Sequence, residues 1–484
     1  MAEKSRRASL PRTTVTLLLL FGTAAFGVTL LFTTMDPWMI DGGIFAGGLD
    51  VHIYRDGGWR VLHDRALYLE PTHYDLLYTY TPFSALAFLP LMLIPWAHVT
   101  TTWMVINLVV LFGCVVLSWR MLGYRVTPAP VAASALLTLA CTFAEPVRTT
   151  LYYGQINLVL MLVVLWDFSR AENSRLRGLG VGIAAGIKLT PLYFIAQYLA
   201  QRRWRAACTA AFTFVATIGL TGLILPRDSY QYWTSTFFQS GRIAPDVHPA
   251  NQSLRGAIAH LSHGPAPLWL WLLIAIPLAL VALWLAAILV RRDEPLLSVT
   301  LGGLTACAVS PYSWGHHWVW FVPLLVYLIH RAQTQHRWWS AAAALYLAIG
   351  GWTYTYTPTW ISVGTFLLPP WWPLSDVLIN IYVVLYLATL VGIAILIRTG
   401  APHRQPAPIE PIIIIPPAAE ADSRLTEPLV APQRRGEVVD RAHPDDDRPA
   451  RVDQPQDQSN TPDSRSSWAL PPPKFIPETS SISR

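Results

Sequence analysis

The chain has 484 residues, of which 53% are hydrophobic and 13% charged, and its mean hydropathy is +0.38. Its apolar runs repeatedly reach membrane-spanning length, which takes about 20 residues in a helix. We therefore expect an all-α polytopic membrane protein with about 10–13 transmembrane helices. The net charge of +6 does not indicate nucleic-acid binding, because the positive residues sit in short loops, as membrane orientation requires.

The four cysteines lie within apolar runs and show no CxxC spacing. Cysteines in such runs behave as small buried hydrophobic side chains, so neither a disulfide framework nor a zinc site is indicated. We expect no metal and no cofactor. The four are Cys114, Cys141, Cys208 and Cys307.

Four basic residues precede the first apolar run and predict a cytoplasmic N-terminus, residues 1–12. The run at 13–34 has no clean cleavage site and is long enough to remain as an anchor. Residues 35–79 then form an extracytoplasmic loop with seven acidic residues, whose helical spacing favours short helices along the membrane surface. Charge kept beside a membrane exit usually marks function. Asp50, within Gly47–Tyr54, is predicted to be a catalytic carboxylate.

Four apolar runs follow, at about 82–95, 99–118, 131–146 and 155–168, and their direction across the membrane does not resolve from the sequence. If Arg120 and Arg125 are cytoplasmic, one of the first two runs must be re-entrant. The segment Gly178–Ala200 lies between two basic clusters. Both its ends would then be cytoplasmic, which predicts a hairpin or broken helix with Lys188–Pro191 at its turn.

Beyond residue 205 the apolar runs alternate across the membrane, up to about residue 398. Three loops then fall on the extracytoplasmic side, at 226–265, 310–317 and 351–376. The membrane domain is expected to span 13–400. The tail, 401–484, holds sixteen of the thirty-nine prolines and is predicted to be disordered and cytoplasmic.

One extracytoplasmic carboxylate with cations and aromatic loops suits a transferase that uses a lipid-linked phosphosugar, because the outer side of a bacterial membrane holds no nucleotide sugars. Lys188 and Arg255 would bind the donor phosphate. Asp50 would act as general base on the acceptor hydroxyl, and the leaving phosphate would need only charge stabilisation. Aromatic side chains of the outer loops would stack on sugar rings, among them Trp314, Trp352 and Trp360.

The sequence resembles the polyprenol-phosphate-mannose-dependent α-1,2-mannosyltransferases, glycosyltransferase family 87 with the GT-C fold, over about residues 15–400. The resemblance implies transfer of mannose with inversion, without a metal, to a phosphatidylinositol mannoside or to lipomannan or lipoarabinomannan, on the extracytoplasmic face of the plasma membrane. Six motifs carry it in the family's order: Leu49–Tyr54, Tyr80–Phe83, Gly154–Asn157, Gly186–Pro191, Asn251–Arg255 and Ser310–Trp320.

The resemblance also implies a set of site residues. The family's loop aspartate falls on Asp50, and its paired histidines fall on His316 and His317, which we expect to be catalytic beside the phosphate ligands Lys188 and Arg255. The expected substrate-binding residues are His52, Tyr54, Gln155, Asn157, Asn251, Gln252 and Trp314.

Each assignment has a structural alternative. Asp50 could be one solvated loop carboxylate among seven, and the two histidines could be interfacial anchors. Lys188 could extend to a lipid headgroup, and Arg255 could pair with Asp246 as a loop salt bridge. Further alternatives are that Gln155 and Asn157 cap a helix and that the tryptophans of 352–372 form an interfacial belt.

Other functions also stay open. A transporter or flippase for a lipid-linked sugar would share the apolar bulk, the cations and the polar cavity. Such transporters often contain paired inverted repeats, and the sequence shows none. A transferase of another polyprenol-phosphate sugar remains an alternative, because nothing in the sequence identifies the sugar. A structural scaffold would not need Lys188 or the paired histidines.

Overall fold

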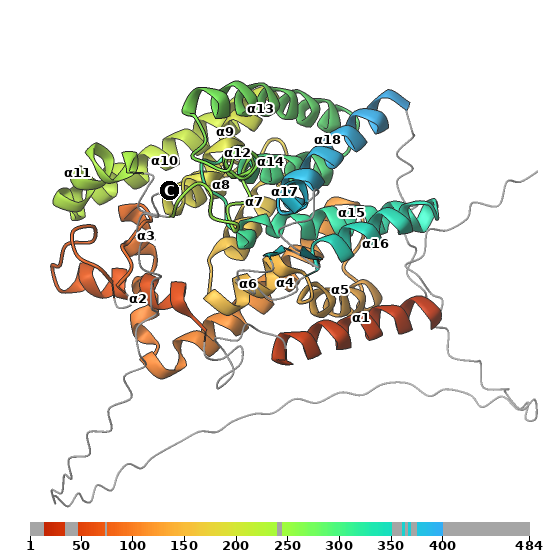
Figure 1. Cartoon of the computed structure of the whole chain (residues 1–484), viewed down its shortest axis with the longest axis horizontal. Coiled ribbons are helices and arrows are strands. Elements are labelled where there is room, and N and C mark those ends of the chain that lie inside the picture. Colours follow the sequence, from red (N-terminus) through yellow and green to blue (C-terminus); the bar gives the residue numbers. More distant parts are fainter. Residues whose placement is uncertain are drawn as a thin grey trace, which may run out of the picture. The chain divides into compact units, whose positions relative to one another are not determined.

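The computed structural model describes residues 14–33, 47–72, 75–239, 244–350, 361–363, 366–368 and 375–399, all within one compact unit. This unit is built of helices, with one short antiparallel hairpin of β1 (Ile361–Val363) and β2 (Phe366–Leu368) (Figure 1). The predicted N-terminal segment, most of the Trp-rich loop and the tail lie outside the described residues. The helices not introduced below are α1 (Thr14–Thr33), α5 (Pro128–Cys141), α11 (Pro226–Thr234), η6 (Thr236–Phe238), α16 (Trp338–Ala348) and α17 (Ser375–Leu378).

Four described helical segments are long and apolar enough to cross a membrane: Trp96–Met121 (η4 and α4), α10 (Trp204–Ile224), α13 (Leu268–Arg291) and α18 (Ile381–Thr399). A bent pair, α6 (Glu145–Tyr153) and α7 (Asn157–Phe168), makes a fifth if it is one span. These helices confirm a multi-pass membrane protein, while the number of ten to thirteen spans stays a prediction.

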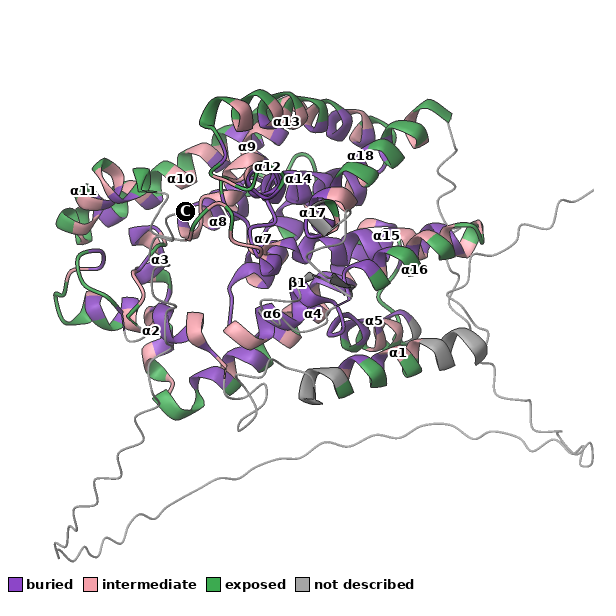
Figure 2. Ribbon diagram, viewed as in Figure 1, coloured by how far each residue is buried: buried purple, intermediate pink, exposed green. Residues whose placement is uncertain are grey.

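The outer faces of the long helices are exposed (Figure 2), and their exposed side chains include many large apolar ones. Phe212 and Leu223 of α10 are 76% and 85% exposed, and Trp284 of α13 is 61% exposed. Contiguous exposed apolar surface of this kind marks an interaction site, and on helices of this length its partner is the lipid of the bilayer.

The segment between the two basic clusters is a helical hairpin, as predicted. Helix α8 (Leu179–Ile187) ends at Lys188, and η5 (Thr190–Leu192) and α9 (Tyr193–Ala200) carry the chain back. The Tyr198 ring at the end of α9 lies 6.0 Å from the guanidinium of Arg177, which precedes α8. Both ends of the hairpin therefore lie together, with Lys188 at the turn.

The apolar run at 82–95 does not cross the molecule. It forms two short pieces, α3 (Pro82–Ala87) and η3 (Leu89–Leu93), because its prolines interrupt helical hydrogen bonding. Thr81, just before α3, donates a hydrogen bond to the Gly186 carbonyl beside Lys188. The run therefore stays at the Lys188 end, and its re-entrant path in the membrane stays a prediction. Helix α4 (Val99–Met121) then leads to the opposite end.

The basic turns gather at the end opposite to Lys188. The Tyr124 hydroxyl, after α4, lies 3.0 Å from His330 Nδ1 near the end of α15 (Phe321–Thr334). The next residue, Arg331, forms a buried ion pair with Glu294 at 3.4 Å, between α13 and α14 (Pro295–Val309). Gln201, after α9, reaches Ser298 of α14 at 3.1 Å. These contacts join four basic turns at one end of the bundle.

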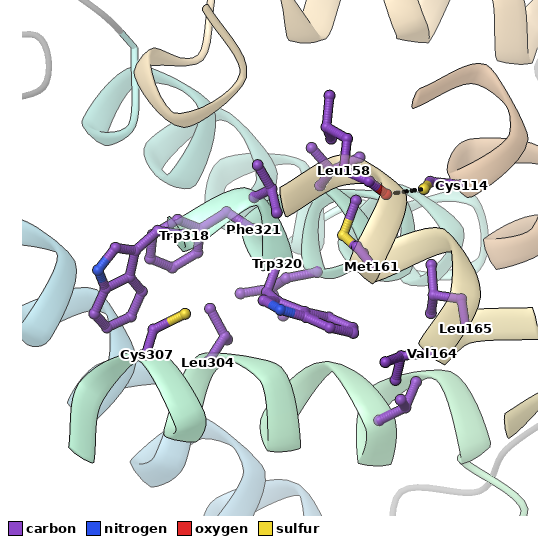
Figure 3. Packing of buried hydrophobic residues seen from close by; sticks show 14 of the residues in the cluster. Cys114, Leu158, Met161, Val164, Leu165, Leu304, Cys307, Trp318, Trp320 and Phe321 are labelled. Atoms are coloured by element: carbon purple, nitrogen blue, oxygen red, sulfur yellow. Dashed lines mark hydrogen bonds between the residues drawn. The ribbon is translucent and has the colours of Figure 1, made fainter. Parts of the chain in front are cut away.

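The core beneath the site is a close packing of α7, α14 and η8 (Gly315–Trp320). Figure 3 shows the Trp320 indole between Met161 of α7 and Leu304 of α14. A side chain at Gly303 would collide with this indole, so the close approach of η8 to α14 requires glycine at this position.

We expect Gly303→Ala to destabilise the protein by about 1–3 kcal/mol, the typical cost of overpacking a dense core, because a Cβ there would overlap the Trp320 indole. Thermal unfolding of the detergent-solubilised protein measures this. Gly219→Ala is the control: nothing lies within 4 Å of a Cβ there, and alanine is the better helix former. Equal melting temperatures for both variants would contradict the packing.

Candidate active site

Helix α2 (Leu49–Leu62) places Asp50 in its first turn. The amide of Gly48 donates to the Tyr152 carbonyl at 2.7 Å, which fixes the start of α2 against the end of α6. The partial positive charge at a helix N-terminus favours a carboxylate in the first turn. Asp50 is therefore held on a rigid element and not on a loop tip.

The Asp50 carboxyl is partly buried, and loss of water raises its pKa to about 6. A hydrogen bond from Gln155 and the charge of Lys188 act in the opposite direction and hold the pKa below the level that burial alone would give. A carboxylate with a pKa near 6 is ionised at neutral pH and still basic enough to accept a proton, which suits a general base.

Two phenols and one amide lie beside Asp50. The Tyr54 hydroxyl, one turn along α2, lies 2.7 Å from the Tyr80 hydroxyl. The two hydroxyls lie 2.9 and 3.1 Å from Gln155 Oε1 respectively, and at least one of them donates to it. Tyr54 and Gln155, two predicted site residues far apart in the sequence, are thus brought together with Asp50.

Lys188 lies on the other side of the same cluster. Its Nζ donates to Asn157 Oδ1 at 3.0 Å and lies 2.9 Å from His317 Nε2 and 5.3 Å from the centre of the Tyr80 ring. No carboxylate in the described ranges forms a salt bridge with Lys188. Its positive charge is therefore only partly compensated, by Asp50 through space.

The contact with Lys188 fixes the tautomer of His317. An ammonium group only donates hydrogen bonds, so His317 Nε2 is the acceptor and Nδ1 carries the proton. Nδ1 faces Ser313 Oγ at 3.4 Å. The ring is thus oriented from both sides, and His317 is a neutral ligand that holds the lysine.

His316 has one ring nitrogen without a partner in the described part of the chain. Its ring lies between Trp314, at 6.2 Å and nearly parallel, and Tyr153, at 6.0 Å and edge-on. His316 is 6% exposed, and Nε2 has no hydrogen-bond partner among the residues that the structure describes. A buried ring nitrogen without a partner is costly, which favours a substrate group as its partner.

A cavity of about 30 Å³ continues from Lys188 into the bundle. This volume holds about one water molecule. Polar groups line the end at Lys188 and apolar side chains most of the remainder. The lining residues are Asn157, Leu160, Met161, Val164, Lys188, Thr190, Pro191, Phe194, Ala306, Cys307, His317, Val319 and Trp320.

Arg255 does not join Lys188. Arg255 lies on α12 (Leu254–Ser262), and its guanidinium pairs with Asp246. Nη2 lies 2.9 Å and Nε 3.0 Å from the same carboxylate oxygen. The guanidinium also lies 5.9 Å from the Trp271 ring. The loop salt bridge, one of the two interpretations of Arg255, is confirmed, and its role with phosphate stays a prediction.

Asn251 and Gln252 are buried and hold neighbouring loops. Asn251 Oδ1 accepts from the Ser313 amide at 3.2 Å. Gln252 Nε2 donates to the Ile379 carbonyl at 2.7 Å, and the backbone N–H of Gln252 donates to the Ser313 carbonyl at 2.7 Å. These contacts fix the loop that carries the two histidines.

His52 points away from this cluster. Its Nε2 lies 3.1 Å from Thr100 Oγ1, and its ring packs on Trp96 at 4.2 Å. His52 follows Asp50 by two residues, which is about 200° around the helix axis. It therefore lies on the side of α2 opposite to Asp50. It anchors α2 on the start of α4.

One buried glutamate, Glu145, is not among the site residues predicted from the sequence. Glu145, 3% exposed, lies directly behind Gly315, and Tyr382 of α18 donates a hydrogen bond to its carboxylate. Glu145 is the only acidic residue between Asp75 and Asp167. An isolated acid in a long apolar stretch is a functional signal in a membrane protein, and it would have marked this residue. Tyr80 and Ser313 lie within two of the six motifs, Tyr80–Phe83 and Ser310–Trp320, which is the signal that could have identified them.

The chain is similar to proteins of one known family. A family model described as "Glycosyltransferase family 87" matches residues 78–311. A Mycobacterium tuberculosis protein, "Polyprenol-phosphate-mannose-dependent alpha-(1-2)-phosphatidylinositol pentamannoside mannosyltransferase", is 36% identical over 292 residues, 59% of this chain and 67% of that protein. A Mycolicibacterium smegmatis protein of the same name is also 36% identical, over 59% of this chain and 70% of its own length.

A second M. smegmatis protein, "Polyprenol-phosphate-mannose-dependent alpha-(1-2)-phosphatidylinositol mannoside mannosyltransferase", is 32% identical over 331 residues, 63% of this chain and 75% of its own. No solved structure matches the chain.

Proposed function

The chain belongs to glycosyltransferase family 87, and on that premise we propose that it transfers mannose from polyprenol-phosphate-mannose to a phosphatidylinositol mannoside. The bond formed is an α-1,2 linkage, made with inversion at the extracytoplasmic face of the plasma membrane. The observation that carries this proposal is the meeting of the Asp50 carboxylate and the Lys188 ammonium in one polar cluster.

In the proposed reaction, Asp50 takes the proton from the acceptor hydroxyl while that oxygen attacks the anomeric carbon of the donor mannose. The bond from this carbon to the phosphate oxygen breaks, and the pair of electrons leaves with polyprenol phosphate. Attack from the side opposite to the phosphate converts a β-linked donor to an α-linked product. Lys188 stabilises the charge on the departing phosphate, and Asp50 must be ionised to act.

The other predicted site residues have different roles because their surroundings differ. His316 Nε2 and the partly exposed Trp314 are available to a sugar, and His317 holds Lys188 in place. Arg255 could bind phosphate only by sharing its guanidinium with Asp246, so we propose Lys188 as the principal phosphate ligand. We propose that Asn251 and Gln252 act by holding loops, that His52 acts by holding α2 on the start of α4, and that none of the three touches substrate.

The charge distribution supports the proposed sidedness. Asp50, Lys188 and the paired histidines lie at one end of the helices, and four basic turns lie at the other end. Loops rich in lysine and arginine stay on the cytoplasmic side of a membrane. The Asp50 end is therefore proposed to face the extracytoplasmic space, where a lipid-linked sugar donor is the available substrate.

The test is a transfer assay in membranes that overproduce the protein, with radiolabelled polyprenol-phosphate-mannose and phosphatidylinositol mannosides. We expect a labelled glycolipid from which an α-1,2-specific mannosidase releases the label. Label that stays on the donor yet crosses the bilayer would instead establish a flippase. Product that resists the mannosidase would refute the linkage.

A further inference from the structure

The bend between α6 and α7 touches both halves of the site. The chain bends by 117° between the two helices, and the four residues Gly154–Asn157 form the bend. Gly154 has φ +70°, and a Cβ there would lie 2.7 Å from Val51, the neighbour of Asp50. Only glycine adopts this conformation at no steric cost. Because glycine has no side chain, the bend lies directly against the first turn of α2.

The orientation of the Gln155 amide is fixed by its surroundings. Its oxygen lies 2.9 and 3.1 Å from the Tyr54 and Tyr80 hydroxyls, and since these two groups share two protons among their three mutual contacts, at least one of them donates to it. The amide nitrogen is then left to donate to Asp50, whose pKa the Gln155 side chain lowers. Gln155 is 4% exposed, so water does not compete for these bonds.

The orientation of the Asn157 amide is fixed in the opposite sense. Its oxygen accepts from Lys188 Nζ at 3.0 Å, and its nitrogen donates to the His316 carbonyl at 3.1 Å. Asn157 is 7% exposed. The two amides of one bend therefore present a donor to the carboxylate and an acceptor to the ammonium.

We propose that Gln155 and Asn157 are positioning residues, Gln155 for the carboxylate of Asp50 and Asn157 for the ammonium of Lys188, and that neither binds substrate. This proposal rests on the proposed function and replaces substrate binding as the role expected for the two residues. The bend then fixes the distance between base and cation, and reacting groups held in a fixed geometry react faster.

A positioning role has a pH signature that a substrate contact lacks. Among the residues that the structure describes, the groups that face Asp50 are Tyr54 on its own helix, Tyr80 before α3, Gln155 at the bend and Lys188 at the hairpin turn. Of these, only Lys188 carries a charge near neutral pH. Replacing the Gln155 amide by a carboxyl removes a donor and adds negative charge, and both changes make it harder for Asp50 to lose its proton.

The experiment is the pH dependence of mannosyl transfer by full-length wild type and by Gln155→Glu in the same membranes. For wild type, kcat/KM should rise as Asp50 ionises, with a midpoint near pH 6. For Gln155→Glu the midpoint should move up by about one to two pH units, which lowers activity at pH 7 by roughly 2–10-fold and restores most of it by about pH 9. The KM for both substrates should change little.

Tyr78→Phe is the matched control. Tyr78 is also buried, and its hydroxyl contacts Ser84 at 2.6 Å and not Gln155. Gln155→Met, which is close in shape and has no donor, should move the midpoint in the same direction if Gln155→Glu does not fold. An unchanged midpoint with a raised acceptor KM would overturn the proposal. If Asp50→Asn is itself active, the proposed function fails and not only this inference.

Discussion

Asp50→Asn should lower the rate of mannosyl transfer by about 10³–10⁴-fold, which is the upper range for loss of a positioned general base. The variant keeps the shape of the side chain and removes only its ability to take a proton. Gln155 can still donate to the side-chain oxygen that the new amide retains, so the first turn of α2 should keep its fold. The measurement is turnover at saturating donor and acceptor, so that the loss appears in kcat.

Asp64→Asn is the control for this change. Asp64 is an exposed carboxylate of the same loop, and its φ of +51° is a conformation that asparagine adopts as readily as aspartate. It should retain full turnover. Equal losses in the two variants would show that the loop needs its negative charge and not a base at Asp50.

Lys188→Met should lower kcat by about 10²–10³-fold, the effect of removing one preorganised group that stabilises charge in the transition state. Arg205→Met is the control, because it removes the same charge from an exposed position at the basic end. An Arg205→Met loss as large as that of Lys188→Met would indicate that net charge, and not the site, controls turnover.

Lys188 can also be followed chemically, since it is the only lysine between Lys4 and Lys474. An amine-selective acylating reagent should modify it in the unliganded protein, and mass spectrometry of the peptide around Lys188 reads the extent. Bound polyprenol phosphate should protect it. Modification at the same rate with and without this lipid would show that the ammonium does not contact the phosphate.

The sequence predicted those features of the site that follow from charge and membrane direction. The hairpin with Lys188 at its turn follows from two basic clusters that must lie on one side, and the contact of Arg177 with Tyr198 confirms it. A carboxylate at a membrane exit is costly without a function, and the family resemblance singles out Asp50 among the seven acidic residues of this loop. Neither inference needs a knowledge of packing.

Features that depend on packing could not be predicted in this way. The run at 82–95 has the length of a span, but Pro90 and Pro95 within it end each short helix, and the Thr81 contact with Gly186 holds it at one end. The Asp246 partner of Arg255 was one of two open interpretations, because both residues lie in a loop whose path the sequence does not define.

The roles of the amides are a third case. Gln155 and Asn157 are neighbours of a glycine in a short polar motif, which fits helix capping, substrate binding and positioning equally well. Only the directions of their hydrogen bonds separate these roles: Tyr54 and Tyr80 occupy the Gln155 oxygen, and Lys188 occupies the Asn157 oxygen.

In the proposed reaction, Asp50 performs chemistry on a donor that Lys188 holds. Donor binding and turnover by purified wild type and Asp50→Asn, reconstituted in the same liposomes, test it most directly. We expect both proteins to bind polyprenol-phosphate-mannose with similar affinity and only the wild type to form the α-mannosidase-sensitive glycolipid. Turnover by Asp50→Asn at the wild-type rate would contradict the role of Asp50 as the general base.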